Sequence, residues 1–159
     1  MSSKKPLGYN KKEVLIMRFI TSGPRETEKI GLILAKKLKG GEILGLTGEL
    51  GSGKTCFVKG LAKGLDIKQL ITSPSFVFLK VFPTKKNRKI RLLIHLDLYR
   101  LKNKAGIENI IPLDYFSKKD IVMVIEWVDR IKNKLPSKTR FIKFKILKNN
   151  QRLISLLGN

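Results

Sequence analysis

The hydrophobic positions along this chain repeat with two different periods, which predict alternating strands and helices. Short runs that are apolar throughout, or at every second position, predict strands over residues 14–20, 42–47, 75–82, 89–97, 121–125, 141–147 and 152–157. Apolar residues three or four positions apart predict a helix that begins near Pro24 and ends at Gly40 and Gly41. A second helix includes Phe57 and ends near Gly64. This order of elements indicates an α/β fold.

The segments between these elements predict two hairpins and a short helix. A basic turn over residues 83–88 joins the third strand to the fourth, and Asn149 and Asn150 lie between the last two strands. Residues 105–116 predict a short helix and turn. Residues 1–12 carry lysines without an apolar run, so we expect a disordered basic tail there. A chain of 159 residues can bury one substantial core, and we expect residues 13–159 to form a single domain.

A phosphate-binding motif stands between the second strand and the second helix. Residues 48–55 read Gly-Glu-Leu-Gly-Ser-Gly-Lys-Thr and match G-x-x-x-x-G-K-[ST]. The glycines allow backbone N–H groups to surround phosphates, while the following helix directs its positive end at the same charge. Lys54 is expected to reach the β- and γ-phosphates and Thr55 to ligate Mg²⁺. A glycine-rich surface turn is the alternative, and the strand before the motif and the helix after it favour the phosphate loop.

Two carboxylates follow apolar strands. Glu126 ends the apolar run 121–125, as a Walker B acid that holds Mg²⁺ or its water would. Asp97 stands at the carboxyl end of its strand, where ligands bind in open α/β sheets, and could position a metal-bound water or the attacking water. Either acid could instead return to solvent or cap the next turn. His95 shares a face with Asp97 and is expected to be structural, because the chain has no second histidine.

The composition adds a strong positive charge and little else. Thirty-four Lys and Arg against 12 Asp and Glu give a formal net charge of +22, enough to attract nucleic acid. The lysines are scattered along the chain beside Ile and Asn. This pattern is typical of the codon bias of a low-GC genome and favours that explanation over a dedicated RNA-binding face. The single cysteine, Cys56, cannot form an intramolecular disulfide, and no apolar run is long enough to span a bilayer. We therefore expect a cytoplasmic protein that makes no membrane contact.

Together these motifs resemble the bacterial TsaE (YjeE) family, the ATPases of the threonylcarbamoyladenosine tRNA-modification pathway. The resemblance covers nearly the whole chain after residue 20. It rests on the order of residues 48–55, Thr-Ser-Pro-Ser-Phe at 72–76, His-Leu-Asp-Leu-Tyr-Arg-Leu at 95–101, Glu-Trp at 126–127 and Leu-Pro at 135–136. The Asp-Leu-Tyr-Arg-Leu and Glu-Trp pieces make it much more specific than the phosphate loop alone.

The resemblance implies a P-loop NTPase-like domain with a mixed, mainly central parallel β-sheet flanked by helices. It implies that the domain binds ATP and Mg²⁺, hydrolyses ATP slowly, and acts on a complex of TsaB and TsaD homologues. That complex attaches the threonylcarbamoyl group to the adenosine beside the anticodon of tRNAs that read codons beginning with A. A TsaE-type protein would not carry out this transfer, and it would meet tRNA through the complex, with direct contact as an alternative.

The resemblance also implies roles for individual residues. Lys54, Asp97 and Glu126 would be catalytic, and Thr55 and Glu126 would serve the metal. Trp127 would lie beside the nucleotide. The full set of expected ATP-binding residues is Gly48, Leu50, Gly51, Ser52, Gly53, Lys54, Thr55 and Trp127.

A switch-like loop and one departure from the family pattern complete the expectations. Ser73 and Ser75 would sense the γ-phosphate or Mg²⁺, although an ordinary Ser-Pro turn is the alternative. Cys56 replaces a threonine that is usual in the family, and a thiol donates hydrogen bonds poorly. A small-molecule P-loop kinase and a basic RNA-binding module with a nucleotide switch are the competing function classes. The kinase would need an acceptor, and the RNA-binding module would bind RNA without a protein partner.

Overall fold

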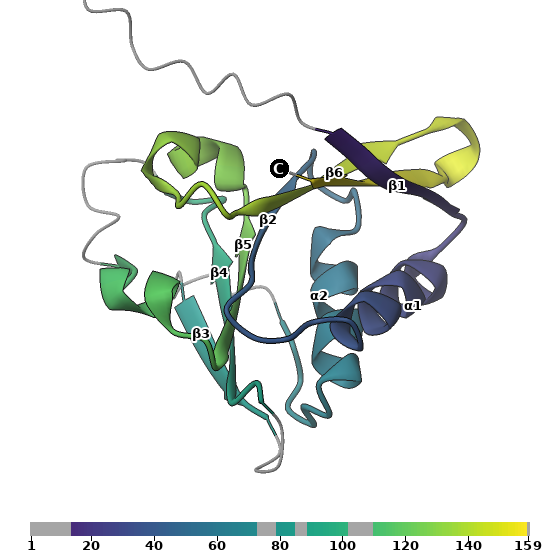
Figure 1. The fold of residues 1–159 in the computed structure, drawn as a ribbon. Coiled ribbons are helices and arrows are strands. Elements are labelled where there is room, and N and C mark those ends of the chain that lie inside the picture. The colour runs from purple at the N-terminus through teal and green to yellow at the C-terminus, as the bar shows by residue number, and fades with distance from the viewer. Residues whose placement is uncertain (1–13, 73–78, 85–88, 102–109, 159) are drawn as a thin grey trace, which may run out of the picture.

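Seven strands form one sheet in the computed structural model, which describes residues 14–72, 79–84, 89–101 and 110–158 (Figure 1). The strands are β1 (Val14–Thr21), β2 (Ile43–Thr47), β3 (Leu79–Pro83), β4 (Leu92–Asp97), β5 (Ile121–Glu126), β6 (Arg140–Ile146) and β7 (Arg152–Gly158). The helices are α1 (Pro24–Ala35) and α2 (Lys54–Gly64), with the short 3₁₀ helices η2 (Leu113–Ser117), η3 (Val128–Lys134) and η4 (Lys148–Asn150). The expected tail, residues 1–12, lies outside the described residues.

The sheet is mixed and its centre is parallel, as predicted. Its strand order is β1-β7-β6-β2-β5-β4-β3, and β6, β2, β5 and β4 are paired in parallel. The β1–β7, β7–β6 and β4–β3 pairs are antiparallel, which confirms both predicted hairpins. Because parallel strands end at one edge, the carboxyl ends of β2, β5 and β4 bring Thr47, Glu126 and Asp97 together there.

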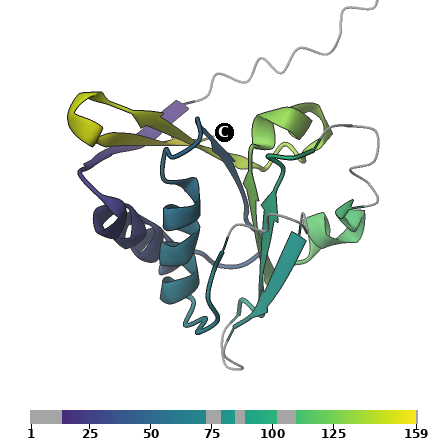
Figure 2. The same ribbon diagram turned by 180° about the vertical axis from the view of Figure 1, so that it is seen from behind.

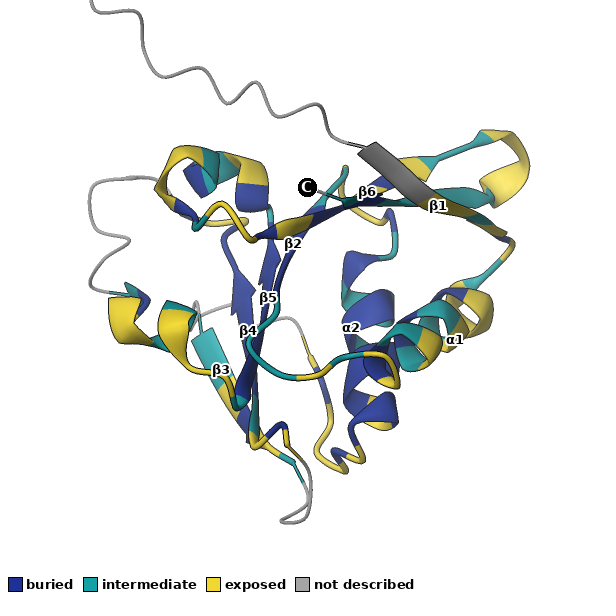
Figure 3. Cartoon of the chain, in the orientation of Figure 1, coloured by how far each residue is buried: buried dark blue, intermediate teal, exposed yellow. Residues whose placement is uncertain are grey.

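Two helices cover one face of the sheet, and shorter segments cover the other (Figures 1 and 2). The larger core lies between the sheet and the pair α1 and α2, and a second core lies beneath η2 and η3. Figure 3 shows the central strands and the inner side of α2 as the most continuously buried part of the fold. Among the described residues, no helix is both long and apolar enough to cross a membrane.

Close approach of α1 and α2 depends on glycine. A Cβ built on Gly60 would lie 1.9 Å from the backbone oxygen of Glu28, and one on Gly31 would lie 2.2 Å from that of Phe57. These contacts are with backbone atoms, so neither helix can make room by changing a rotamer. The glycines let α1 pack directly against α2 and thereby support the helix that follows the phosphate loop.

We expect Gly60→Ala to destabilise the fold by at least about 2 kcal/mol, because overpacking against backbone costs roughly 1–3 kcal/mol or more. Urea unfolding measures the change. Gly23→Ala is the matched control, since a Cβ there has nothing within 4 Å. A Gly60→Ala protein as stable as Gly23→Ala would contradict the close approach of the two helices.

Several element boundaries differ from the predictions. Helix α1 ends at Ala35 and does not reach Gly40, because the Glu42 carboxylate accepts hydrogen bonds from the N–H groups of Lys39 and Gly40 and stabilises a turn. Strand β4 begins at Leu92 and not at residue 89. The helix η3 has no counterpart among the predictions. Residues 75–78 of the predicted third strand, 85–88 of its turn and 105–109 of the predicted short helix lie outside the described residues.

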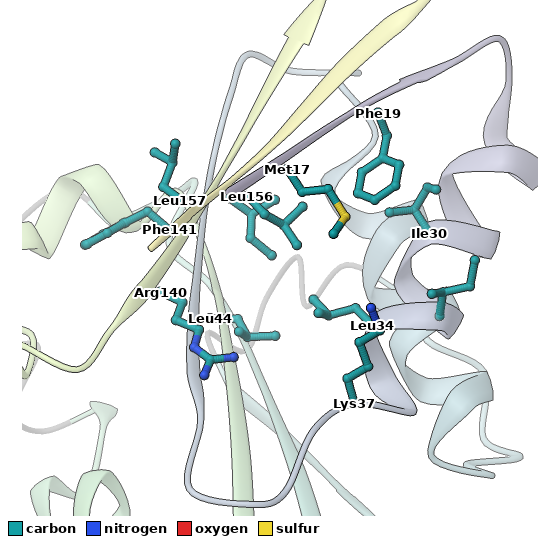
Figure 4. A pocket seen from close by; sticks show the side chains of 12 residues that line it. Met17, Phe19, Ile30, Leu34, Lys37, Leu44, Arg140, Phe141, Leu156 and Leu157 are labelled. Atoms are coloured by element: carbon teal, nitrogen blue, oxygen red, sulfur yellow. The ribbon is translucent and has the colours of Figure 1, made fainter. Parts of the chain in front are cut away.

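A cavity of about 200 Å³ opens at the amino ends of the parallel strands (Figure 4). Its walls are mainly apolar side chains of β1, α1 and β7, including Met17, Leu34 and Leu156, while Lys37 and Arg140 also line it. Leu44 and Arg140 occupy paired positions near the starts of β2 and β6. The cavity is therefore at the opposite edge of the sheet from the phosphate loop.

Candidate nucleotide site

The loop between β2 and α2 has the backbone shape that its glycines predict. Gly48, Gly51 and Gly53 have positive φ angles of 144°, 76° and 101°, which side-chain-bearing residues rarely adopt. At Gly48 a Cβ would also lie 2.6 Å from the backbone oxygen of Phe144. No side chain of the described residues caps the start of α2, so the N–H groups of its first turn can receive an anion.

Lys54 is folded back onto this loop. Its Nζ donates hydrogen bonds to the backbone oxygens of Gly48 at 2.6 Å and Glu49 at 2.9 Å, and to Oγ of Ser52 at 3.3 Å. The side chain is only 5% exposed, and this burial lowers the pKa of Lys54, opposed by the negative charges of Glu126 and Asp97. The ammonium group thus lies desolvated inside the loop, where an arriving phosphate would compensate its charge.

Thr55 and Glu126 meet although they are 71 residues apart in the chain. The Thr55 hydroxyl donates to Glu126, with Oγ1 3.0 Å from Oε1 and 3.2 Å from Oε2. Glu126 is 2% exposed and also contacts His95, whose Nε2 lies 2.8 Å from Oε1. The structure therefore joins the last residue of the phosphate motif to the acid that ends β5.

The donor set at this point suits Mg²⁺ bound together with a nucleotide. Among the described residues, no group of three or more His, Cys, Asp or Glu side chains could hold a metal ion. Mg²⁺ needs less from a protein, because it is usually bound through one or two carboxylates together with waters and substrate phosphates. The hydroxyl of Thr55 and the carboxylate of Glu126 are hard oxygen ligands of that kind. The residues present fit the metal that the sequence predicts.

Asp97 lies beside Glu126, since the two residues are paired in the β4–β5 register. Its side chain is 8% exposed, and Oδ1 accepts a hydrogen bond from the N–H of Tyr99 at 2.9 Å. Asp97 therefore caps the turn after its strand, which is the alternative that the sequence left open. Its expected catalytic role, positioning the attacking water, stays a prediction.

Trp127 lies against Lys54, and its position adds two residues that the sequence did not single out for this site. Lys54 Nζ is 4.2 Å from the centroid of the Trp127 ring. The centroids of the Trp127 and Tyr99 rings are 5.1 Å apart, and the two rings are tilted relative to each other. The guanidinium of Arg130 lies 5.8 Å from the Trp127 ring and 6.0 Å from that of Tyr99. Trp127 has a φ of 59°, which is rare for a bulky residue.

The other predicted site residues differ in burial, and two of them lie outside the described residues. Leu50 is 69% exposed on the loop, and Ser52 is fully buried within it. Ser73 and Ser75 of the expected switch-like loop lie outside the described residues. Arg152 was not predicted to be near the site, yet its Nη2 donates to the backbone oxygen of Gly51 at 3.3 Å. Only the folding of β7 beside β6 brings this arginine to the loop, and no local pattern signals it.

Comparison with known proteins gives concordant results. A family model described as threonylcarbamoyl adenosine biosynthesis protein TsaE matches residues 21–154. The tRNA threonylcarbamoyladenosine biosynthesis protein TsaE of Treponema pallidum is 35% identical over 144 residues, covering 88% of this chain and 99% of that protein. The protein of the same name from Bacillus subtilis is 33% identical over 145 residues, covering 90% of this chain and 87% of the relative.

A solved structure agrees with the sequence relatives. The crystal structure of Bacillus subtilis YdiB is similar with a TM-score of 0.70 and 30% sequence identity, covering 89% of this chain and 84% of that one. The predicted α/β, P-loop NTPase-like fold is thereby confirmed. With a family model that spans most of the sequence, the chain belongs to the TsaE family of threonylcarbamoyl adenosine biosynthesis proteins.

Proposed function

We propose that this chain is a Mg²⁺-dependent ATP-binding protein and slow ATPase that supports a TsaB–TsaD complex in forming threonylcarbamoyladenosine on tRNA. The observation that carries the proposal is the contact of Thr55 with Glu126 beside the buried Lys54. Those three side chains are the phosphate and metal ligands expected of a P-loop ATPase. The names of the relatives, which refer to tRNA threonylcarbamoyladenosine biosynthesis, support the pathway.

In this proposal the chain's own groups bind and orient the nucleotide. Lys54 leaves the carbonyl groups of Gly48 and Glu49 and pairs with the β- and γ-phosphates, while the loop N–H groups and the start of α2 receive the remaining phosphate charge. Thr55 and Glu126 would hold Mg²⁺, which would supply positive charge to neutralise the phosphoryl group. Asp97 orients the attacking water from the neighbouring strand end.

The coupling to partners is tested by hydrolysis measurements. We expect the purified chain to turn over ATP slowly alone and faster when TsaB and TsaD of the same organism are added. A Lys54→Met protein should hydrolyse ATP neither alone nor with TsaB and TsaD. Wild-type turnover that is unchanged by TsaB and TsaD, and that appears only with a small-molecule acceptor, would contradict the proposal and favour a kinase.

A further inference from the structure

The candidate site contains a histidine that the proposed function does not use. His95 is the single histidine of the chain, and its side chain is 0% exposed on β4. Its Nε2 lies 2.8 Å from Oε1 of Glu126. Among the described residues, its Nδ1 has no hydrogen-bond partner. A fully buried polar ring with a single contact, made to the candidate metal ligand, calls for a physical explanation.

The direction of this hydrogen bond follows from the chemistry of its two partners. A carboxylate that serves as a metal ligand is ionised and can only accept hydrogen bonds. The hydrogen must then be on Nε2 of His95, which donates to Oε1 of Glu126. A hydrogen on Nδ1 would be a buried donor without an acceptor among the described residues, and such a donor is costly. The geometry therefore favours the tautomer with its hydrogen on Nε2.

The hydrogen bond from His95 holds the Glu126 carboxylate from a second side. Glu126 accepts from Thr55 on α2 and from His95 on β4, so its carboxylate is held between a helix and the neighbouring strand. A metal at Thr55 would bind a lone pair of the hydroxyl oxygen, whereas the hydrogen bond between His95 and Glu126 involves no metal ligand other than Glu126. The bond from His95 then remains, in a place with no solvent to substitute for it.

We propose that His95 is a positioning residue for the metal site: its Nε2–H holds Oε1 of Glu126 and so orients the carboxylate toward the Mg²⁺ that Thr55 also binds. Hydrogen bonds of this kind, made by a residue behind the ligand, typically change metal affinity or activity by about 10–100-fold when removed. The inference rests on the proposed function, because it assigns Glu126 to Mg²⁺.

Two amide variants of different length separate positioning from simple packing. In His95→Gln the amide nitrogen can take the place of Nε2, whereas in His95→Asn it takes the place of Nδ1 and falls short of Glu126. We expect Asn to raise the Mg²⁺ concentration for half-maximal ATP hydrolysis by about tenfold or more. Gln should restore most of this loss. ATP binding measured in EDTA should be the same in both variants. Equal Mg²⁺ requirements in Gln, Asn and wild type would overturn the proposal.

A measurement on the wild-type chain needs neither activity nor a variant. Because the chain has one histidine, a long-range ¹H–¹⁵N NMR spectrum of ¹⁵N-histidine-labelled protein reports His95 alone. We expect the Nε2–H tautomer in the free protein and its retention when Mg²⁺ and a non-hydrolysable ATP analogue are added. The Nδ1–H tautomer in either state would overturn the inference. This test remains decisive even if the variants do not fold.

The outcomes distinguish this inference from the proposed function. A wild-type chain that does not bind Mg²⁺ and ATP contradicts the proposed function. A wild-type chain that binds both, together with a His95→Asn protein that has the same Mg²⁺ requirement, contradicts only the role of His95.

Discussion

Replacing Lys54 with methionine should abolish detectable ATP binding without destabilising the nucleotide-free protein. The ammonium group is buried against carbonyl oxygens, and each hydrogen bond that it would make to a phosphate is worth about 1.5–3 kcal/mol. Losing the bonds to both phosphates should weaken ATP binding by more than about 100-fold, which puts it below detection in the titration. Methionine keeps most of the apolar stem and removes a desolvated charge, so thermal unfolding without nucleotide should occur at the same temperature or higher.

Lys59→Met, on the outer part of α2, is the matched control. It makes the same substitution one and a half turns further along the helix and should bind ATP as the wild type does. Calorimetric titration with ATP measures the affinities, and circular dichroism gives the unfolding temperatures. If Lys54→Met bound ATP as tightly as Lys59→Met, Lys54 would not be the phosphate ligand.

The lowered pKa of Lys54 also determines how the free energy of unfolding changes with pH. Its pKa is lowered by burial, so at this position the folded chain binds fewer protons than the unfolded chain does. The contribution of this group to the free energy of unfolding therefore rises with pH, from below the lowered pKa up to the ordinary value of 10.5. In Lys54→Met this contribution is lost, and stability should depend less on pH over that range.

The second large effect is expected for Glu126→Gln. This substitution keeps one side-chain oxygen that can accept hydrogen bonds from Thr55 and His95, removes the negative charge and replaces the second oxygen with an NH₂ group. We expect Mg²⁺-dependent ATP hydrolysis to fall about 100-fold, because charge stabilisation by a bound metal is worth several kcal/mol. Nucleotide binding in EDTA should change little or become tighter, since a carboxylate near the phosphates is gone.

Glu49→Gln provides the comparison for this prediction. Glu49 belongs to the same phosphate loop, but its side chain is exposed and is not expected to contact the metal. Hydrolysis rates measured across a range of Mg²⁺ concentrations separate the two variants. Equal rates for Glu126→Gln and Glu49→Gln would remove Glu126 from the metal site.

Much of the fold could be predicted because the local signals agree with one another. The glycines of the phosphate loop, the apolar run before Glu126 and the paired Asn149 and Asn150 each require one local geometry, and the structure has it. The predicted end of α1 was wrong because the Glu42 carboxylate competes for the N–H groups of Lys39 and Gly40. Helical periodicity does not register such a competing acceptor.

The candidate residues of the site could be predicted from the sequence, but the contacts between them could not. The sequence predicts that Thr55 and Glu126 share a metal site, and the contact between them that the structure shows depends on the parallel pairing of β2 and β5. The approach of His95 to Glu126 depends on the β4–β5 pairing, and Arg130 comes from a helix that periodicity did not predict. Contacts between distant segments are set by tertiary packing, which a pattern within one segment does not contain.

The most direct test of the nucleotide site is ATP binding followed through Trp127, the single tryptophan of the chain, whose ring lies 4.2 Å from Lys54 Nζ. Titration of the wild-type protein with ATP should change the tryptophan emission saturably, with higher affinity in Mg²⁺ than in EDTA, and Lys54→Met should show no such change. An emission that ATP leaves unaltered in wild type, with no binding heat in the same buffer, would contradict an ATP site at this loop.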